Sequence, residues 1–97
     1  MTLNQTEATF FTFSELERYI HQTICTDNDL LEEAFPMSET RLSRSTGELC
    51  GVIFCVHGPR NAEFSAIWEK EQNRVLFYKS SGERYRLVLL GETYPTI

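Results

Sequence analysis

The chain has 97 residues, of which 41% are hydrophobic and 12% aromatic, and its formal net charge is −5. This length suits one domain, and this apolar content is too high for a disordered chain. It contains no apolar run of about 20 residues and no signal-peptide pattern at its N-terminus, which excludes a membrane-spanning or secreted protein as the first expectation. We therefore expect a single cytoplasmic domain over residues 1–97.

The charges are unevenly distributed along the chain. Residues 1–39 contain one basic and eight acidic side chains, whereas residues 40–97 contain eight basic and six acidic side chains. A nucleic-acid-binding domain needs a concentrated basic face, which this distribution does not provide. We therefore expect no nucleic-acid partner and, from the hydropathy, no membrane partner.

The N-terminal third predicts a short polar tail followed by one amphipathic helix. Residues 1–9 are mostly polar, and we expect them to be disordered. Thr12 and Glu15 have the spacing of a capping box, in which each side chain accepts a hydrogen bond from the other residue's backbone. A helix over about 13–25 then places four apolar residues on one face: Phe13, Leu16, Ile20 and Ile24. The acidic segment 27–34 is compatible with one further helical turn, which Pro36 would end.

From Thr40 onward the apolar residues alternate with a period of two, which is typical of β-strands. We predict five strands at about 40–44, 48–57, 60–69, 74–79 and 83–90. The predicted fold class is α+β, with the N-terminal helix packed on a five-stranded antiparallel meander. A cystatin-like helix-on-sheet arrangement has this shape, and a small open barrel is the alternative.

Two predicted turns share the pattern basic-Ser-x-Gly-Glu, at Arg44–Glu48 and at Lys79–Glu83. A three-residue hairpin loop needs a left-handed residue at its last position, where glycine is favoured. The pattern therefore predicts two hairpins with the same turn. It also predicts cross-strand ion pairs between the first and last residues of each turn.

The predicted register assigns the two faces of the sheet. A tight turn at Gly58-Pro59 would pair His57 with Arg60. One face then holds the predicted core residues, which are Leu49, Ile53, Cys55, Ala62, Phe64, Ala66, Trp68, Val75, Phe77, Tyr85, Leu87 and Leu89. The opposite face holds Cys50 and seven residues that we take as a predicted interaction surface, because this face is more apolar than a solvated one should be: Leu42, Val52, Phe54, Val56, Ile67, Leu76 and Tyr78. The chain itself could also cover this face.

Four sequence segments carry a resemblance to a known group. The segment 49–60 reads LCGVIFCVHGPR, and AIWE at 66–69, VLFY at 75–78 and GER at 82–84 follow it. Together they resemble a group of short bacterial proteins of unknown function predicted in planctomycete genomes. The resemblance spans residues 13–90 and implies no activity, cofactor or site.

His57, Arg60 and Lys79 are the candidate ligand-binding residues. In the predicted register they gather at one end of the core face, where Arg60 could bind an anion and His57 could titrate. The same residue types are common in solvated turns, so a plain hairpin explains them as well.

The predicted helix also carries Glu17, His21 and Cys25 at four-residue spacing, so these side chains form one row. A catalytic pair or half of a metal site could be read from them, but a polar helix flank is the simpler interpretation. Cys25, Cys50 and Cys55 are odd in number, and Cys50 and Cys55 would project to opposite faces of one strand, so we expect reduced cysteines. We expect no metal, no cofactor and no catalytic residue.

The first functional hypothesis is therefore a non-enzymatic protein-interaction module, as a homodimer or with another protein. The alternative is a small domain that binds or transforms an anionic ligand near His57 and Arg60.

Overall fold

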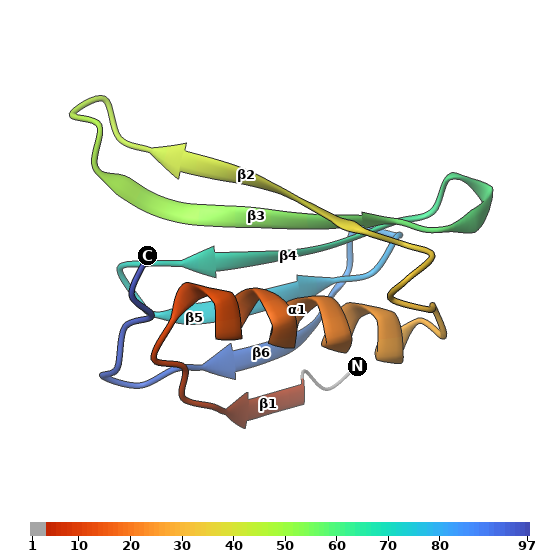
Figure 1. Ribbon diagram of the computed structural model, residues 1–97, viewed down its shortest axis with the longest axis horizontal. Helices are drawn as coiled ribbons and strands as arrows, with labels where there is room; N and C mark the ends of the chain where they lie inside the picture. Colours follow the sequence, from red (N-terminus) through yellow and green to blue (C-terminus); the bar gives the residue numbers. More distant parts are fainter. Residues whose placement is uncertain (1–3) are drawn as a thin grey trace.

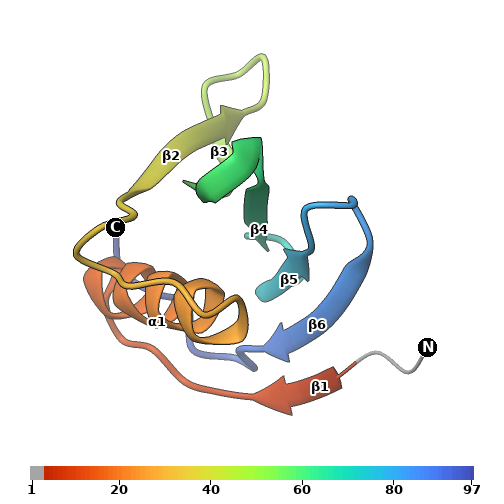
Figure 2. The ribbon, with the colours of Figure 1, turned by 90° about the vertical axis from the view of Figure 1, so that its right-hand side faces the viewer.

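The computed structural model describes residues 4–97. One helix, α1 (Phe13–Asp27), packs on one face of a sheet that curls around it (Figure 1, Figure 2). The strands are β1 (Asn4–Glu7), β2 (Met37–Ser43), β3 (Leu49–His57), β4 (Glu63–Glu69), β5 (Arg74–Tyr78) and β6 (Arg84–Leu89). They lie in the order β1-β6-β5-β4-β3-β2, with β1 parallel to β6 and all other neighbours antiparallel. The α+β class and the meander are confirmed, but the sheet has six strands and is mixed.

The sixth strand comes from the segment that was expected to be disordered. Gln5 pairs with Leu87 in the parallel ladder, and the Ala8 N–H donates to the Leu89 carbonyl at 3.1 Å. All four residues of β1 are exposed, so backbone pairing holds this strand without an apolar face. That is why hydrophobic alternation did not reveal it. Residues 1–3 of the expected tail lie outside the described part of the chain.

Both ends of α1 are closed by backbone-capping motifs. The predicted capping box is confirmed, because the Glu15 N–H donates to Thr12 Oγ1 at 3.2 Å and the Thr12 N–H donates to Glu15 Oε1 at 2.9 Å. At the other end, the Leu30 N–H donates to the Cys25 carbonyl at 2.8 Å, while Asp29 has a left-handed φ of 56°. This is a Schellman ending with aspartate at the position that glycine usually occupies. No helix in the described part of the chain is both long and apolar enough to cross a membrane.

Asp27, in the last turn of α1, is held by two side chains of β6. Its carboxylate accepts hydrogen bonds from Arg86 Nε at 3.1 Å, Arg86 Nη2 at 3.0 Å and the Tyr85 hydroxyl at 2.8 Å. An acidic side chain is unfavourable at the negative end of a helix, so this forked arginine contact offsets a local cost. The contact ties the end of α1 to β6.

The two predicted hairpins share their geometry. The Arg44 N–H donates to the Glu48 carbonyl, and the Lys79 N–H donates to the Glu83 carbonyl, both at 2.8 Å. Gly47 and Gly82 both have a φ of 90°, in the region that glycine tolerates best. Arg44 does not form an ion pair with Glu48 as predicted; its guanidinium lies 3.3 Å from the carboxylate of Glu71, in the turn between β4 and β5.

Each of these hairpins also contains a β-bulge just before its turn, between Leu42 and Ser43 and between Phe77 and Tyr78. The second bulge shifts the register of β6 by one residue, so Val75 faces Val88. The core therefore receives Val88, whereas Leu87 and Leu89, which were predicted in the core, point to the other face.

The register between β3 and β4 is the main correction to the predicted faces. His57 pairs with Glu63, not with Arg60, because the connection is a five-residue loop over 58–62. Arg60 and Asn61 in this loop have left-handed φ angles of 59° and 62°. The pairing differs from the expectation by an odd number of residues, which exchanges the two faces of β3.

The core lies between α1 and the concave face of the sheet. Val52, Phe54 and Val56 of β3 are completely buried there, so they do not belong to an interaction surface as was predicted. Their partners in the core are Phe13, Leu16, Ile20, Ile24, Ala66, Trp68, Val75, Phe77, Val88 and Leu90.

One buried polar side chain, Asn73, joins three parts of the chain. It lies in the turn between β4 and β5 with a φ of 48° and is only 1% exposed. Its Oδ1 accepts a hydrogen bond from Trp68 Nε1 at 3.1 Å, and its Nδ2 donates to the carbonyls of Gly91 and Thr93 at 3.0 and 2.8 Å. All of these polar groups are buried or partly buried, so the amide satisfies groups that water reaches poorly.

We expect Asn73→Ala to lower the free energy of unfolding by about 2–4 kcal/mol, because it leaves the Trp68 N–H and two carbonyls without their partner. Asn61→Ala is the matched control, since Asn61 has the same left-handed backbone but lies exposed in a loop. Urea denaturation measures both variants. Equal losses would show that the backbone conformation, and not the hydrogen-bond node, determines the effect.

Candidate functional site

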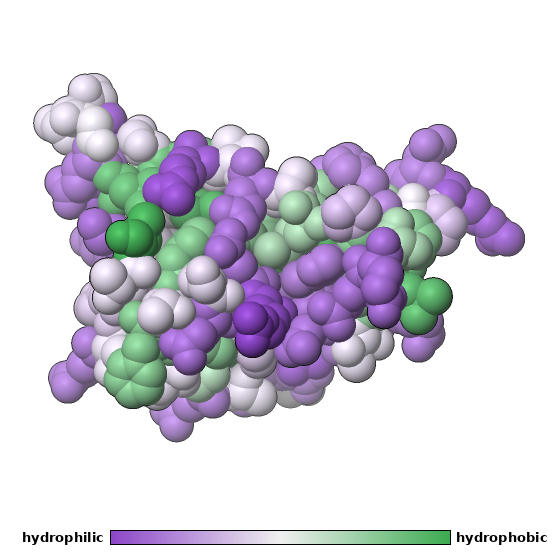
Figure 3. Space-filling view, in the orientation of Figure 1, coloured by the Kyte–Doolittle hydropathy of each residue, from purple (hydrophilic) through white to green (hydrophobic). Residues whose placement is uncertain are grey.

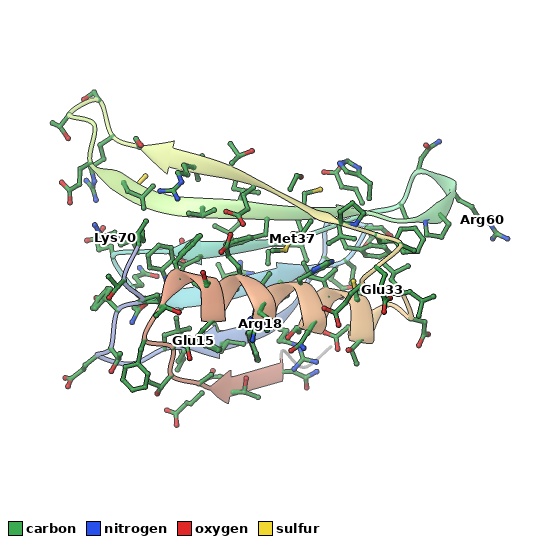
Figure 4. All side chains as sticks on the ribbon, viewed as in Figure 1. Glu15, Arg18, Glu33, Met37, Arg60 and Lys70 are labelled. Carbon is green, nitrogen blue, oxygen red and sulfur yellow. The ribbon has the colours of Figure 1, made fainter. Side chains whose placement is uncertain are left out.

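The face of the sheet that points away from α1, called the outer face below, has no covering helix or strand within residues 4–97. The opposite side of the molecule, over α1, is largely hydrophilic (Figure 3), and Arg18 points outward there (Figure 4). Four strands contribute one apolar side chain each to a continuous row across the outer face. Ladder pairing joins its members in the order Ile53, Ile67, Leu76 and Leu87. The row begins beside Thr40 of the edge strand β2, which pairs with Ile53.

The outer face retains part of the predicted interaction surface. Leu42, Ile67 and Tyr78 lie on it and are at least partly exposed, whereas Leu76 lies on this face but is only 4% exposed. Ile53, Cys55 and Leu87, which were assigned to the core, replace the three buried β3 residues on this face. An apolar second face is therefore present, with a different membership from the predicted one.

A depression of about 340 Å³ lies at the end of the outer face near the β2–β3 turn. Leu42 and Ile67 form part of its wall, and Gly51 leaves its floor without a side chain. A Cβ atom at Gly51 would lie 2.6 Å from the Trp68 carbonyl oxygen, so the close approach of β3 and β4 requires glycine there.

At the opposite end of the outer face, three chemically reactive side chains lie together: Cys55, His57 and Glu63. Cys55 and His57 are two residues apart on β3 and therefore share a face, and Glu63 of β4 pairs directly with His57. Cys55 Sγ is 3.7 Å from His57 Nε2, and His57 Nδ1 is 3.9 Å from Glu63 Oε2. The side chains of His57 and Glu63 are 70% and 63% exposed, so the cluster opens to solvent.

Cys55 is the most enclosed member of this cluster. Burial, the negative charge of Glu63 and a hydrogen bond to Glu63 together raise the pKa of its thiol to about 11, and burial is the largest of the three causes. A thiol with such a pKa is protonated at neutral pH, whereas a cysteine nucleophile works through a low-pKa thiolate. The arrangement by itself therefore does not support cysteine nucleophilic catalysis.

The three predicted ligand-binding residues have separate surroundings. His57 lies in the cluster just described, while Arg60 extends away from the sheet at the tip of the β3–β4 loop (Figure 4). The Lys79 amino group lies 5.9 Å from the centre of the Tyr85 ring. These positions give no support to a shared anion pocket, which stays a prediction.

The three residues of the predicted row on α1 make contacts with different parts of the chain. His21 Nε2 lies 2.8 Å from the Phe35 carbonyl, and Cys25 is buried, which raises the pKa of its thiol. Glu17 is close to Glu39 of β2, and this carboxyl pair is one reason why the pKa of Glu39 is raised to about 7. Burial of Glu39 is the larger cause, and Arg41 opposes both.

Cys55 and Glu63 were missed as site residues because the predicted register placed them on opposite faces. The spacing Cys55-x-His57 on one strand was the available signal, since it places both side chains on one face whatever the register. Glu63 could not be added without knowing the length of the β3–β4 loop.

Comparisons with protein-family models, with curated proteins and with solved structures found no match to this chain. The resemblance to short planctomycete proteins therefore stays an expectation. Residue geometry alone carries the functional argument.

We expect Glu63→Gln to lower the pKa of the Cys55 thiol, because it removes the negative charge that disfavours the thiolate. The pKa should stay above the ordinary value of 9.0, since burial is the larger cause. The alkylation rate of Cys55 against pH, read by mass spectrometry in the presence of a chelator, measures this shift. Glu69→Gln, on the same strand and face, is the control, and an equal shift there would contradict the assignment to Glu63.

Proposed function

We propose that this protein is a non-enzymatic protein-interaction module whose partner is a second copy, joined along β2. The observation that carries this proposal is the open edge of β2. This strand is last in the sheet order, and six of its seven residues are exposed. An exposed edge strand offers backbone donors and acceptors that can pair with another strand.

The direction of the backbone groups supports pairing at the centre of β2. The Lys70 N–H donates to the Cys50 carbonyl, and the Gly58 N–H donates to the Ala62 carbonyl, so even-numbered residues of β3 point toward β4. Odd-numbered residues of β3 then point toward β2, where their partners are even-numbered. The backbone groups of Glu39 and Arg41 consequently point toward the open edge.

The sequence of β2 is self-complementary about Thr40. If two copies pair antiparallel around a two-fold axis at Thr40, Glu39 faces Arg41 of the second copy, and Arg41 faces the other Glu39. Opposite charges directly across two strands stabilise a sheet by about 0.2–1 kcal/mol for each pair. The pairing uses the residues whose backbone groups point outward, so the hydrogen-bond pattern and the charges favour the same register.

The second copy would also relieve an unfavourable local interaction. Glu39 lies beside Glu17, and Arg41 of the same strand compensates only in part, with its guanidinium 5.7 Å above the Phe13 ring. An additional arginine from the second copy would stabilise the ionised form of Glu39. This arrangement supports a symmetric interface, in which each surface binds an identical one.

The outer face supports the same function. The apolar row starts at Ile53, next to Thr40, so two copies joined at Thr40 would place their rows end to end. The six-stranded sheet would double, with the two apolar rows separated only by the two Thr40 side chains. The described cysteines are all free thiols, which supports the proposed cytoplasmic setting.

We expect Glu39→Arg and Arg41→Glu each to weaken the dimer about tenfold or more, because each change replaces two attractive contacts with two repulsive ones. An equimolar mixture of the two variants should form a heterodimer, since every contact across the interface is then attractive again. The double variant Glu39→Arg/Arg41→Glu should also recover the homodimer. Sedimentation velocity gives the dissociation constants, and circular dichroism checks folding.

A wild-type protein that stays monomeric at high concentration would contradict the proposal. So would a dimer that survives both single charge reversals. Loss of the dimer on Ile67→Glu alone would indicate association through the outer face and not through the edge.

We expect the dimer to weaken as the pH falls from about 8 to about 6. Glu39 has a pKa of about 7 in the single chain, and pairing with Arg41 of the second copy should lower it. A carboxyl whose pKa is lower in the dimer favours dimerisation above the single-chain pKa and loses this contribution as the group becomes protonated. Glu39→Gln should remove most of this dependence, and an unchanged profile would contradict the assignment to Glu39.

A further inference from the structure

Cys55, His57 and Glu63 offer sulfur, nitrogen and oxygen ligands at one point of the outer face. The ligand atoms, one from each residue, all lie within 4.8 Å of one another. The three residues are held by a regular antiparallel ladder, and the Gly58 N–H closes the hairpin beyond them on the Ala62 carbonyl at 2.8 Å. Donors on paired strands are positioned more closely than donors on loops, because the backbone holds their spacing.

The separations are close to those of a tetrahedral metal site. With metal–ligand bonds of about 2.0–2.3 Å, tetrahedral ligand atoms lie about 3.3–3.8 Å apart. The Cys55 Sγ to His57 Nε2 distance of 3.7 Å lies in this range. The 3.9 Å distance to Glu63 Oε2 is measured from the other ring nitrogen, His57 Nδ1, and a single ion binds only one of these two nitrogens. With one ligand atom from each residue, the three atoms lie within 4.8 Å of one another, and rotation of the exposed side chains of His57 and Glu63 has to close the remaining gap.

We propose that Cys55, His57 and Glu63 bind one divalent transition-metal ion of the zinc class, with an open fourth position. The donor set selects this class, because thiolate and imidazole prefer zinc, cobalt and similar ions, whereas magnesium and calcium require several oxygen ligands. Three protein ligands leave a coordination position for water or an exchangeable ligand. The metal ion can reach the site from solvent, because the side chains of His57 and Glu63 are exposed.

The residues around the thiol are compatible with such a site. Cys55 lies between Ser65 of β4 and Ser38 of β2 in the ladder, so two small polar residues flank it. The Cys50 thiol, in contrast, donates a hydrogen bond to the Leu42 carbonyl at 3.2 Å, and Cys25 is buried in the core. Within the described residues, Cys55 is therefore the thiol that has both a histidine and a carboxylate as neighbours.

Titration of the full chain with Co²⁺ tests the proposal directly, because a cobalt–thiolate bond has a charge-transfer absorption that free Co²⁺ lacks. We expect this band to saturate at one Co²⁺ per chain and to disappear when Zn²⁺ is added in excess. Isothermal titration with Zn²⁺ alone gives the stoichiometry and affinity independently.

Variants identify the ligands. Cys55→Ser should abolish the charge-transfer band, whereas Cys50→Ser, on the same strand but away from His57 and Glu63, should leave it unchanged. His57→Ala and Glu63→Gln should each weaken Zn²⁺ binding about tenfold or more, because each removes one of three ligands. Glu69→Gln is the carboxylate control at the far end of β4.

The proposal is overturned if no thiolate band appears, if Cys50→Ser removes it equally, or if His57→Ala and Glu63→Gln bind Zn²⁺ as tightly as the wild type. Folding is checked by circular dichroism, and none of the five substituted positions at the site and its controls is completely buried. The test is independent of dimerisation, because none of these substitutions changes Glu39 or Arg41.

Discussion

The pairing of β3 with β4 is the constraint on which the rest of the structure depends. The loop over 58–62 has two consecutive left-handed residues, Arg60 and Asn61, and it sets His57 opposite Glu63. Side chains alternate along a strand, so this one pairing decides which half of β3 enters the core. It places Val52, Phe54 and Val56 against α1 and leaves Ile53, Cys55 and His57 on the outer face.

Outside the β3–β4 pairing, two groups of polar contacts connect elements that also pack together through apolar side chains. Asn73 joins the Trp68 indole to the C-terminal segment, and Asp27 joins the end of α1 to Arg86 and Tyr85 of β6. Both contacts satisfy groups at the ends of the core, where the apolar packing stops. The two proposed sites lie elsewhere, on the paired strands β2, β3 and β4, where the ladder fixes the spacing of their residues.

The two proposed sites use different properties of one sheet. The edge of β2 offers unfilled backbone pairing and a charge pattern that is symmetric about Thr40, whereas the outer face near the β3–β4 loop offers three metal-ligating atoms. Ser38 connects them in space, because it lies on β2 and pairs with Cys55. The apolar row from Ile53 to Leu87 lies beside both. The outer face and the open edge of β2 therefore carry the features that the core packing does not require.

The sequence by itself determined the helix start at Thr12, the meander and the two glycine turns, because capping, alternation and left-handed turns are local properties. The exposed β1 strand, the left-handed Asp29 and the bulge at Phe77 had no such local signal. The face assignment depended on the length of the β3–β4 loop, which apolar spacing does not reveal. The predicted register was wrong by an odd number of residues, so Cys55 was assigned to the core and Phe54 to the outer face, the reverse of their positions in the structure. The meeting of Cys55, His57 and Glu63 was therefore decided by the tertiary structure, since Glu63 reaches His57 only through the pairing of two strands.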